Sequence, residues 1–178
     1  MLEFRQAEAS DARVIAELHA QSWRNTYRGI LRDDYLDGDI LGERVALWEQ
    51  RLGSREAPQI ALVAFDEGCP VGFAFVLAGA DSTWGAMLDN LHVLPAAQGR
   101  GIGKQLLHRA SVWVRDHFPG QGIFLWVFEA NVHARDFYER LGASVVERTV
   151  VEPPGGGSLA EWRYAWPNID DLCSATEV

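Results

Sequence analysis

The chain has 178 residues, of which 48% are hydrophobic and 23% are charged, a composition typical of a water-soluble globular protein. This length suits one domain with its own core, so we expect a single domain over 1–167 and a tail over 168–178. The net charge of −9 argues against nucleic acid as a partner.

The first half of the sequence predicts a strand, two helices and a hairpin. Residues 2–7 alternate like a strand, and Ser10 is predicted to cap a helix with apolar positions at helical spacing. A shorter second helix is expected around 41–52. Two apolar runs within 59–80 flank a turn containing Gly68, which predicts an antiparallel hairpin.

The second half predicts strands and helices that alternate. A strand over 84–94 leads through a glycine-rich loop into a helix, and the apolar run 122–128 predicts a buried strand. Asn131 is expected to cap a short helix, and Gly142 to end it. The two last strands are expected over 143–151 and 160–166.

Three further features bear on the location of the protein and on metal binding. The tail after Pro167 has few apolar residues, so we expect it to be loosely packed. Cys69 and Cys173 lack metal-ligand spacing, and we expect no metal site. No apolar run reaches the length of a membrane span and no signal-peptide pattern is present, so we expect a cytoplasmic protein without a membrane partner.

The stretch "LHVLPAAQGRGIGKQLLHRA" places Gly99, Gly101 and Gly103 between a predicted strand and a predicted helix. A glycine loop at a helix N-terminus can bind an anion through backbone N–H groups. The spacing G-x-G-x-G is not that of a dinucleotide fingerprint. A nucleotide-phosphate loop would need a longer spacing and a hydroxyl where Gln105 stands. A nucleotide-binding phosphotransferase is therefore disfavoured.

Two motifs together resemble the GNAT superfamily of N-acetyltransferases. The element Q-x-x-G-x-G begins at Gln98, and "NVHARDFYERLGA" follows about thirty residues later. The resemblance spans nearly the whole chain. It implies an α/β GNAT fold: a single domain with a mixed, mostly antiparallel sheet of about seven strands, splayed between the fourth and fifth strands and flanked by helices.

The resemblance also implies acetyl-CoA as cosubstrate. Its pyrophosphate would lie on the N–H groups of the glycine loop, and its pantetheine arm between the splayed strands. The residues expected to contact it are Leu91, Val93, Gln98, Gly99, Arg100, Gly101, Ile102, Gly103, Lys104, Asn131, Ala134, Phe137 and Tyr138.

Acetyl transfer to an amine needs a donor for the oxyanion, a route for protons and an acid for the departing sulfur. By resemblance, the Val93 N–H at an irregularity of its strand is the oxyanion donor and Tyr138 is the acid. Strand alternation places Asp89 on the face of Val93, where it could relay a proton through water. His92 would point to the opposite face, and a structural role is expected for it.

In the resembled family the acceptor site is walled by the first two helices with their connecting loop and by the hairpin between the last two strands. Here these regions contribute Trp23, Tyr27 and Tyr35. The acids of the adjoining loop could attract a cationic amine or could form a solvated surface, and they are Asp33, Asp34, Asp37 and Asp39. We expect a small-molecule or peptide amine as acceptor, and the family commonly forms a homodimer. The alternative is a noncatalytic module that binds or senses acyl-CoA.

Overall fold

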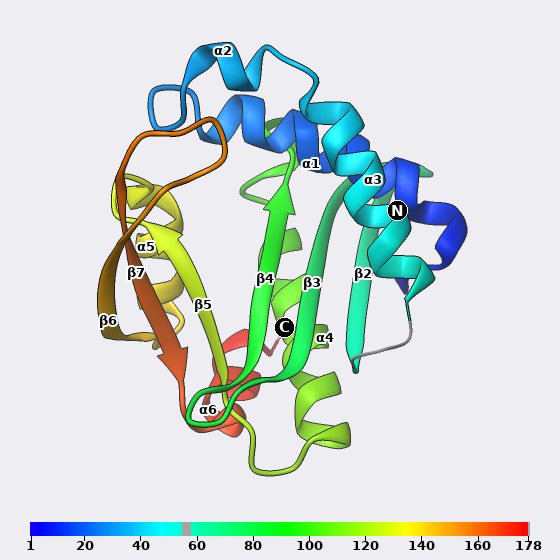
Figure 1. Ribbon diagram of the computed structural model, residues 1–178. Coiled ribbons are helices and arrows are strands. Elements are labelled where there is room, and N and C mark those ends of the chain that lie inside the picture. The colour runs from blue at the N-terminus through cyan, green and yellow to red at the C-terminus, as the bar shows by residue number, and fades with distance from the viewer. Residues whose placement is uncertain (55–57, 178) are drawn as a thin grey trace.

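A seven-stranded sheet forms the centre of the molecule in the computed structural model, which describes residues 1–54 and 58–177. The strand order is β1-β2-β3-β4-β5-β7-β6 (Figure 1). The strands are β1 (Leu2–Gln6), β2 (Gln59–Asp66), β3 (Cys69–Asp81), β4 (Gly85–Val93), β5 (Ile123–Phe128), β6 (Ser144–Val151) and β7 (Leu159–Trp166). Neighbouring strands run antiparallel except β4 and β5, which pair in parallel. The expected mixed sheet is confirmed.

Helices cover both faces of the sheet. They are α1 (Ala12–Thr26), α2 (Asp33–Leu36), α3 (Ile40–Gly53), α4 (Ile102–His117), α5 (Val132–Arg140) and α6 (Ile169–Thr176). The helices α1 and α3 pack on one face, whereas α4 and α6 pack on the other (Figure 1). Within the described part of the chain, no helix is both long and apolar enough to cross a membrane.

The sheet opens between its two parallel strands. Backbone pairing of β4 with β5 is limited to Ala86 with Ile123 and Met87 with Phe124. Beyond these pairs the strands diverge toward the end of the sheet near α1 (Figure 1). The backbone groups in the last part of β4 on this side therefore have no strand partner, which confirms the expected splay between the fourth and fifth strands.

A bulge in β4 corrects our expectation for Asp89. Phe75 of β3 pairs with Asn90 and Val76 pairs with Leu88, so Asp89 is an extra residue without a partner on β3. Because a bulge interrupts the alternation of side chains, Asp89 does not share the face of Val93. The predicted irregularity of this strand exists, but it lies at Asp89 rather than at Val93.

Two local expectations are wrong at the ends of the domain. Ser10 does not cap α1, because a 3-10 turn over Ala9–Asp11 precedes that helix. Instead, the Asp11 carboxylate accepts a hydrogen bond from the Glu8 N–H at 2.8 Å. It also accepts one from each terminal nitrogen of the Arg5 guanidinium, at 2.7 and 2.8 Å. This ion pair joins β1 to the start of α1.

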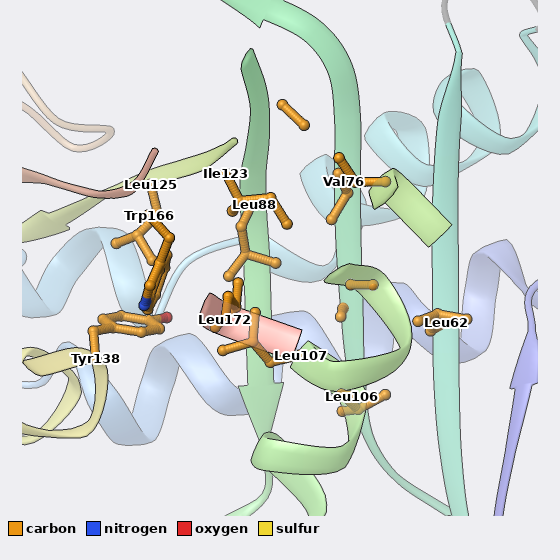
Figure 2. Packing of buried hydrophobic residues seen from close by; sticks show 14 of the residues in the cluster. Leu62, Val76, Leu88, Leu106, Leu107, Ile123, Leu125, Tyr138, Trp166 and Leu172 are labelled. Carbon is orange, nitrogen blue, oxygen red and sulfur yellow. The ribbon is translucent and has the colours of Figure 1, made fainter. Parts of the chain in front are cut away.

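The expected loose tail is also wrong. Residues Ile169–Thr176 form α6, which packs against α4, and Val178 lies outside the described residues. Leu172 is fully buried and lies beside Leu107 of α4 (Figure 2). The sequence "NIDDLCSAT" places its few apolar residues at helical spacing, so a short helix can bury them all on one side.

Candidate active site

One cavity lies on the α4 side of the sheet, where the glycine loop meets the end of β4 and the helix α5. Its walls include most of the residues expected to contact a coenzyme. They are Leu91, Val93, Gln98, Gly99, Gly101, Ile102, Gly103, Lys104, His133, Ala134, Phe137, Tyr138 and Arg140. The structure thus brings together backbone from the loop and side chains from α5.

The glycine loop leaves backbone donors free at the start of α4. Gly99 and Gly101 have φ angles of +76° and +77°, a conformation that residues with a Cβ rarely adopt. The first helical hydrogen bond runs from the Gln105 N–H to the Gly101 carbonyl at 3.0 Å. Among the described residues, no acceptor is found for the N–H groups of Ile102, Gly103 and Lys104. These donors coincide with the positive end of the helix dipole, so the loop is suited to an anion.

Three side chains of the loop have partners within the protein. Gln98 donates from Nε2 to the Val93 carbonyl at 2.9 Å and thereby ties the loop to the end of β4. Arg100 forms an ion pair with Asp66 at 2.6 Å and does not line the cavity. Lys104 lines the cavity and donates to the Glu177 carbonyl at 3.0 Å.

The short helix α5 forms the second wall of the site. Asn131 caps it by accepting the Ala134 N–H at 3.3 Å, and Gly142, with φ +83°, follows its end, as expected. Ala134 and Phe137 pack against the core, while Tyr138 is 8% exposed. Asn131 lines the neighbouring cleft rather than the first cavity.

The splay exposes backbone groups of β4. The Leu94 N–H donates to the Val71 carbonyl of β3 at 2.9 Å. Because successive residues of a strand direct their N–H groups to opposite sides, the Val93 N–H points toward β5. The strands have already diverged there, so this N–H is available to a ligand between them.

A second cavity, the cleft, passes between the diverging strands toward α1. Its walls come from α1, β4, β5 and α5, and they are Ser22, Thr26, Tyr27, Leu88, Asp89, Leu91, His92, Val93, Gln98, Leu125, Trp126, Val127, Asn131, His133, Ala134 and Tyr138. The two cavities share Leu91, Val93, Gln98, His133, Ala134 and Tyr138. A ligand on the α4 side and one on the α1 side can therefore meet at the gap between β4 and β5.

Two tyrosines and an acid occupy the cleft. Burial raises the pKa of Tyr27 to about 12, and the Asp89 carboxylate adds to this shift. Burial, followed by the field of Tyr27, raises the pKa of Tyr138. Both phenols are therefore protonated at neutral pH. Asp89 forms an ion pair with Arg51 of α3 at 2.7 Å and stands on the α1 side of the sheet.

Of the aromatic residues predicted for the acceptor wall, Tyr27 lines the cleft, whereas Trp23 and Tyr35 do not. Trp23 packs beside Tyr27, with ring centroids 5.3 Å apart, and lies under the guanidinium of Arg44 at 4.7 Å. Trp23 therefore supports the wall rather than forming its surface.

The predicted acidic loop is an exposed surface with its own partners. Asp33 and Asp37 pair with Arg28 at 3.1 and 2.7 Å, and Asp34 pairs with Arg32. Asp39 caps α3 by accepting the Gly42 N–H at 3.0 Å. None of these four carboxylates lines the cleft, so the structure favours the solvated-surface alternative.

Sequence reasoning assigned no site role to several cleft residues. His92 and Ser22 line the cleft and approach to 2.9 Å between Nδ1 and Oγ. Trp126 lines it from β5, and Arg140 adds a positive charge to the first cavity. Two of them had a signal in the sequence: His92 directly precedes the predicted oxyanion donor, and Arg140 is a basic residue in the last turn of the motif helix.

The comparisons with known proteins agree with this geometry. The model of the acetyltransferase (GNAT) family matches residues 15–143. The chain belongs to the GNAT family. It is therefore an acyltransferase, and the resemblance in its motifs is confirmed.

Relatives of similar length support the same family. The chain is 27% identical over 174 residues to the uncharacterized N-acetyltransferase YuaI of Bacillus subtilis, covering 97% of this chain and 96% of the relative. It is 30% identical over 159 residues to a Mycobacterium tuberculosis protein named "Probable N-acetyltransferase Rv2775", covering 88% and 87%. The fold is similar to that of the PaiA N-acetyltransferase from Thermoplasma acidophilum, with a TM-score of 0.70, 23% identity and coverage of 90% of this chain and 98% of that one. That protein was crystallised in complex with coenzyme A.

Proposed function

We propose that this protein transfers the acetyl group of acetyl-CoA to a primary amine by direct attack in a ternary complex. The observation that carries the proposal is the pair of cavities that enter the splay from opposite faces and share Tyr138. This arrangement gives each of two substrates its own entrance and one meeting point. A covalent acetyl-enzyme intermediate is not needed.

The residues of the first cavity, on the α4 side of the sheet, fit acetyl-CoA. The free N–H groups at the start of α4 and the left-handed backbone of Gly101 suit a pyrophosphate. Lys104 and Arg140 add positive charge to the same cavity. Acetyl-CoA supplies an acetyl group activated as a thioester. The backbone of Leu91 and Val93 would align its pantetheine arm along β4.

The catalytic roles follow from where charge develops. The Val93 N–H points into the gap and would stabilise the oxyanion. The phenol of Tyr138, which is protonated at neutral pH, would donate its proton to the departing sulfur. Asp89 would attract the ammonium group of the acceptor and pass its first proton to solvent through water. Tyr27 would contact the acceptor from α1.

An amine panel tests this proposal. Purified protein is incubated with acetyl-CoA and, in separate reactions, amino acids, diamines, aromatic amines and peptides with free N-termini. CoA release is followed with a thiol reagent, and each product is identified by mass. An acetylated amine supports the proposal. Acetyl-CoA binding by calorimetry without turnover on any amine would favour the noncatalytic acyl-CoA-binding module.

The proposal also includes a cytoplasmic location and a homodimer. A cytoplasmic enzyme would meet acetyl-CoA, and sedimentation of the purified protein would show whether it forms the expected homodimer. A small-molecule or peptide amine remains the proposed partner.

A further inference from the structure

Two polar side chains on the α1 side of the cleft, a buried serine and a half-buried histidine, have no role in the chemistry above. His92 and Ser22 line the cleft, with His92 Nδ1 2.9 Å from Ser22 Oγ. His92 directly precedes Val93, whose N–H points into the gap between the strands. The imidazole therefore belongs to the wall from which the acceptor would approach the oxyanion donor.

The packing around His92 fixes the position of its ring. The ring centroid lies 5.1 Å from that of His19 and 5.2 Å from that of Phe73. His19 is itself held by Trp48, whose Nε1–H donates to His19 Nδ1 at 3.0 Å. Neutral His19 then carries its proton on Nε2, which is buried and has no acceptor among the described residues.

The unpaired Nε2–H of His19 costs stability. A buried polar group without a partner is unfavourable by about 1–3 kcal/mol. Phenylalanine at position 19 would remove the unpaired Nε2–H, but it would leave the buried Trp48 Nε1–H without its acceptor. The unpaired donor belongs to His19 and not to His92, whose case for a chemical role comes from its place in the cleft wall and its contact with Ser22.

The charge state of His92 suits a proton acceptor. Burial lowers the pKa of His92 to about 4, so the ring is neutral at physiological pH and holds a free electron pair. Such a weak base cannot deprotonate a free ammonium group efficiently. It can deprotonate the nitrogen of a tetrahedral adduct, which is more acidic than a free ammonium group because the carbon attached to it bears electron-withdrawing oxygen and sulfur.

We propose that the Ser22–His92 pair accepts the second proton of the acceptor amine, an inference that rests on the acetyltransferase function proposed above. The amine loses its first proton before attack, by way of Asp89 and water. The N–C bond then forms, and the C–S bond breaks with its electron pair leaving on sulfur. The nitrogen gives its second proton to the imidazole, while the sulfur takes one from Tyr138. Solvent restores both side chains.

Either tautomer of His92 allows this transfer. If Nδ1–H donates to Ser22 Oγ, the electron pair lies on Nε2. If the Ser22 hydroxyl donates to Nδ1, the hydroxyl passes its proton to the ring as it takes one from the nitrogen. The proton ends on the imidazole in both cases, so His92 is a catalytic residue and Ser22 orients or connects it.

The test compares two cleft variants with two matched controls. His92→Ala removes the base, and the control His117→Ala removes an imidazole at the end of α4 that bonds the Trp113 carbonyl. Ser22→Ala removes the partner, and the control Ser111→Ala removes another buried helical hydroxyl, which bonds the His108 carbonyl. Single-turnover rates are measured with saturating acetyl-CoA and the best amine of the panel, with and without added imidazole.

We expect His92→Ala to lower the rate about 10²-fold or more, the usual contribution of a general base. Imidazole in the buffer should restore part of that loss, and acetyl-CoA affinity should stay within about twofold. Ser22→Ala should lower the rate about tenfold, which corresponds to one hydrogen bond. Both controls should react like the wild-type protein.

A folded His92→Ala protein with the wild-type rate would overturn the inference, and so would a loss that imidazole does not restore. If His92→Ala does not fold, His92→Asn replaces it, because the amide can still bond Ser22 but cannot take a proton; wild-type rates in His92→Asn overturn the inference equally. A wild-type protein that acetylates no amine would overturn the proposed function as well. Normal turnover without dependence on His92 would overturn the inference alone.

Discussion

Replacing Gly101 by glutamate should separate coenzyme binding from folding. A Cβ at this position meets nothing within 4 Å, so the substitution causes no clash with the rest of the described protein. The backbone φ of +77° does impose strain, which costs about 1–2 kcal/mol in a residue other than glycine. For a protein of this size we expect the melting temperature to fall by about 2–8 °C.

The effect on coenzyme affinity should be much larger than this strain suggests. The new carboxylate would stand where backbone N–H groups face the pyrophosphate. Two like charges separated by ~6 Å at an effective dielectric constant of 20 repel by about 3 kcal/mol. That energy corresponds to a roughly 100-fold weaker affinity for CoA, because each 1.4 kcal/mol is a factor of ten. Isothermal titration with CoA measures the change directly.

Gly120 offers a matched control at the opposite end of the same helix. Its φ is +85°, and a Cβ there also meets nothing within 4 Å. Gly120→Glu therefore introduces the same charge and similar strain, without a carboxylate at the start of α4. We expect Gly120→Glu to bind CoA like the wild-type protein. If the two variants bound CoA with equal affinity, the assignment of the glycine loop to pyrophosphate would be refuted.

Four other changes have expected outcomes. Asn131→Ala should destabilise the fold by about 1 kcal/mol through loss of the α5 cap, measured by urea unfolding, and weaken acetyl-CoA binding in calorimetry; normal binding would make Asn131 purely structural. Tyr138→Phe should lower kcat by about 10²-fold with unchanged acetyl-CoA affinity, and an unchanged single-turnover rate would exclude it as the acid. Replacing Asp33, Asp34, Asp37 and Asp39 together by Asn should leave the acceptor KM unchanged, since none lines the cleft; a higher KM would place that loop at the acceptor site. Folding lowers the pKa of His92 from 6.5 to about 4, so protonation favours the unfolded chain between these values. The contribution of His92 to the free energy of unfolding should be complete above pH 6.5 and be lost toward pH 4, so Tm should fall less in His92→Phe than in the wild-type protein. An equal fall of Tm in the two proteins over this pH range would contradict the shift.

The cavity at the glycine loop could be predicted from sequence because local rules determine it. Gly99 and Gly101 must adopt positive φ angles, and glycine is the residue that does so without strain. Asn131 and Gly142 mark the ends of α5 through capping preferences that act within a few residues. A short motif thus contains both the loop and the helix that form this cavity.

The C-terminal helix shows a limit of the same reasoning. Its eight residues are too few to form a stable helix in isolation, so local propensity gave no reason to expect order. The order comes from tertiary packing, because Leu172 is fully buried and Cys173 lies against Ser111 of α4. Predicting α6 would have required knowing that α4 presents an uncovered apolar surface at this point.

The acceptor side was harder to predict because a single bulge decides which side chains reach it. Strict alternation through β4 would place Asp89 with Val93, but the extra residue in the strand moves Asp89 to the side of Arg51. His92 keeps the opposite face from Val93, as alternation predicts, yet that face is the wall of the cleft rather than a closed core. The splay explains the difference, because side chains from both faces of β4 line the cleft where β5 diverges from it. A histidine that a continuous sheet would enclose therefore lines an open cleft here.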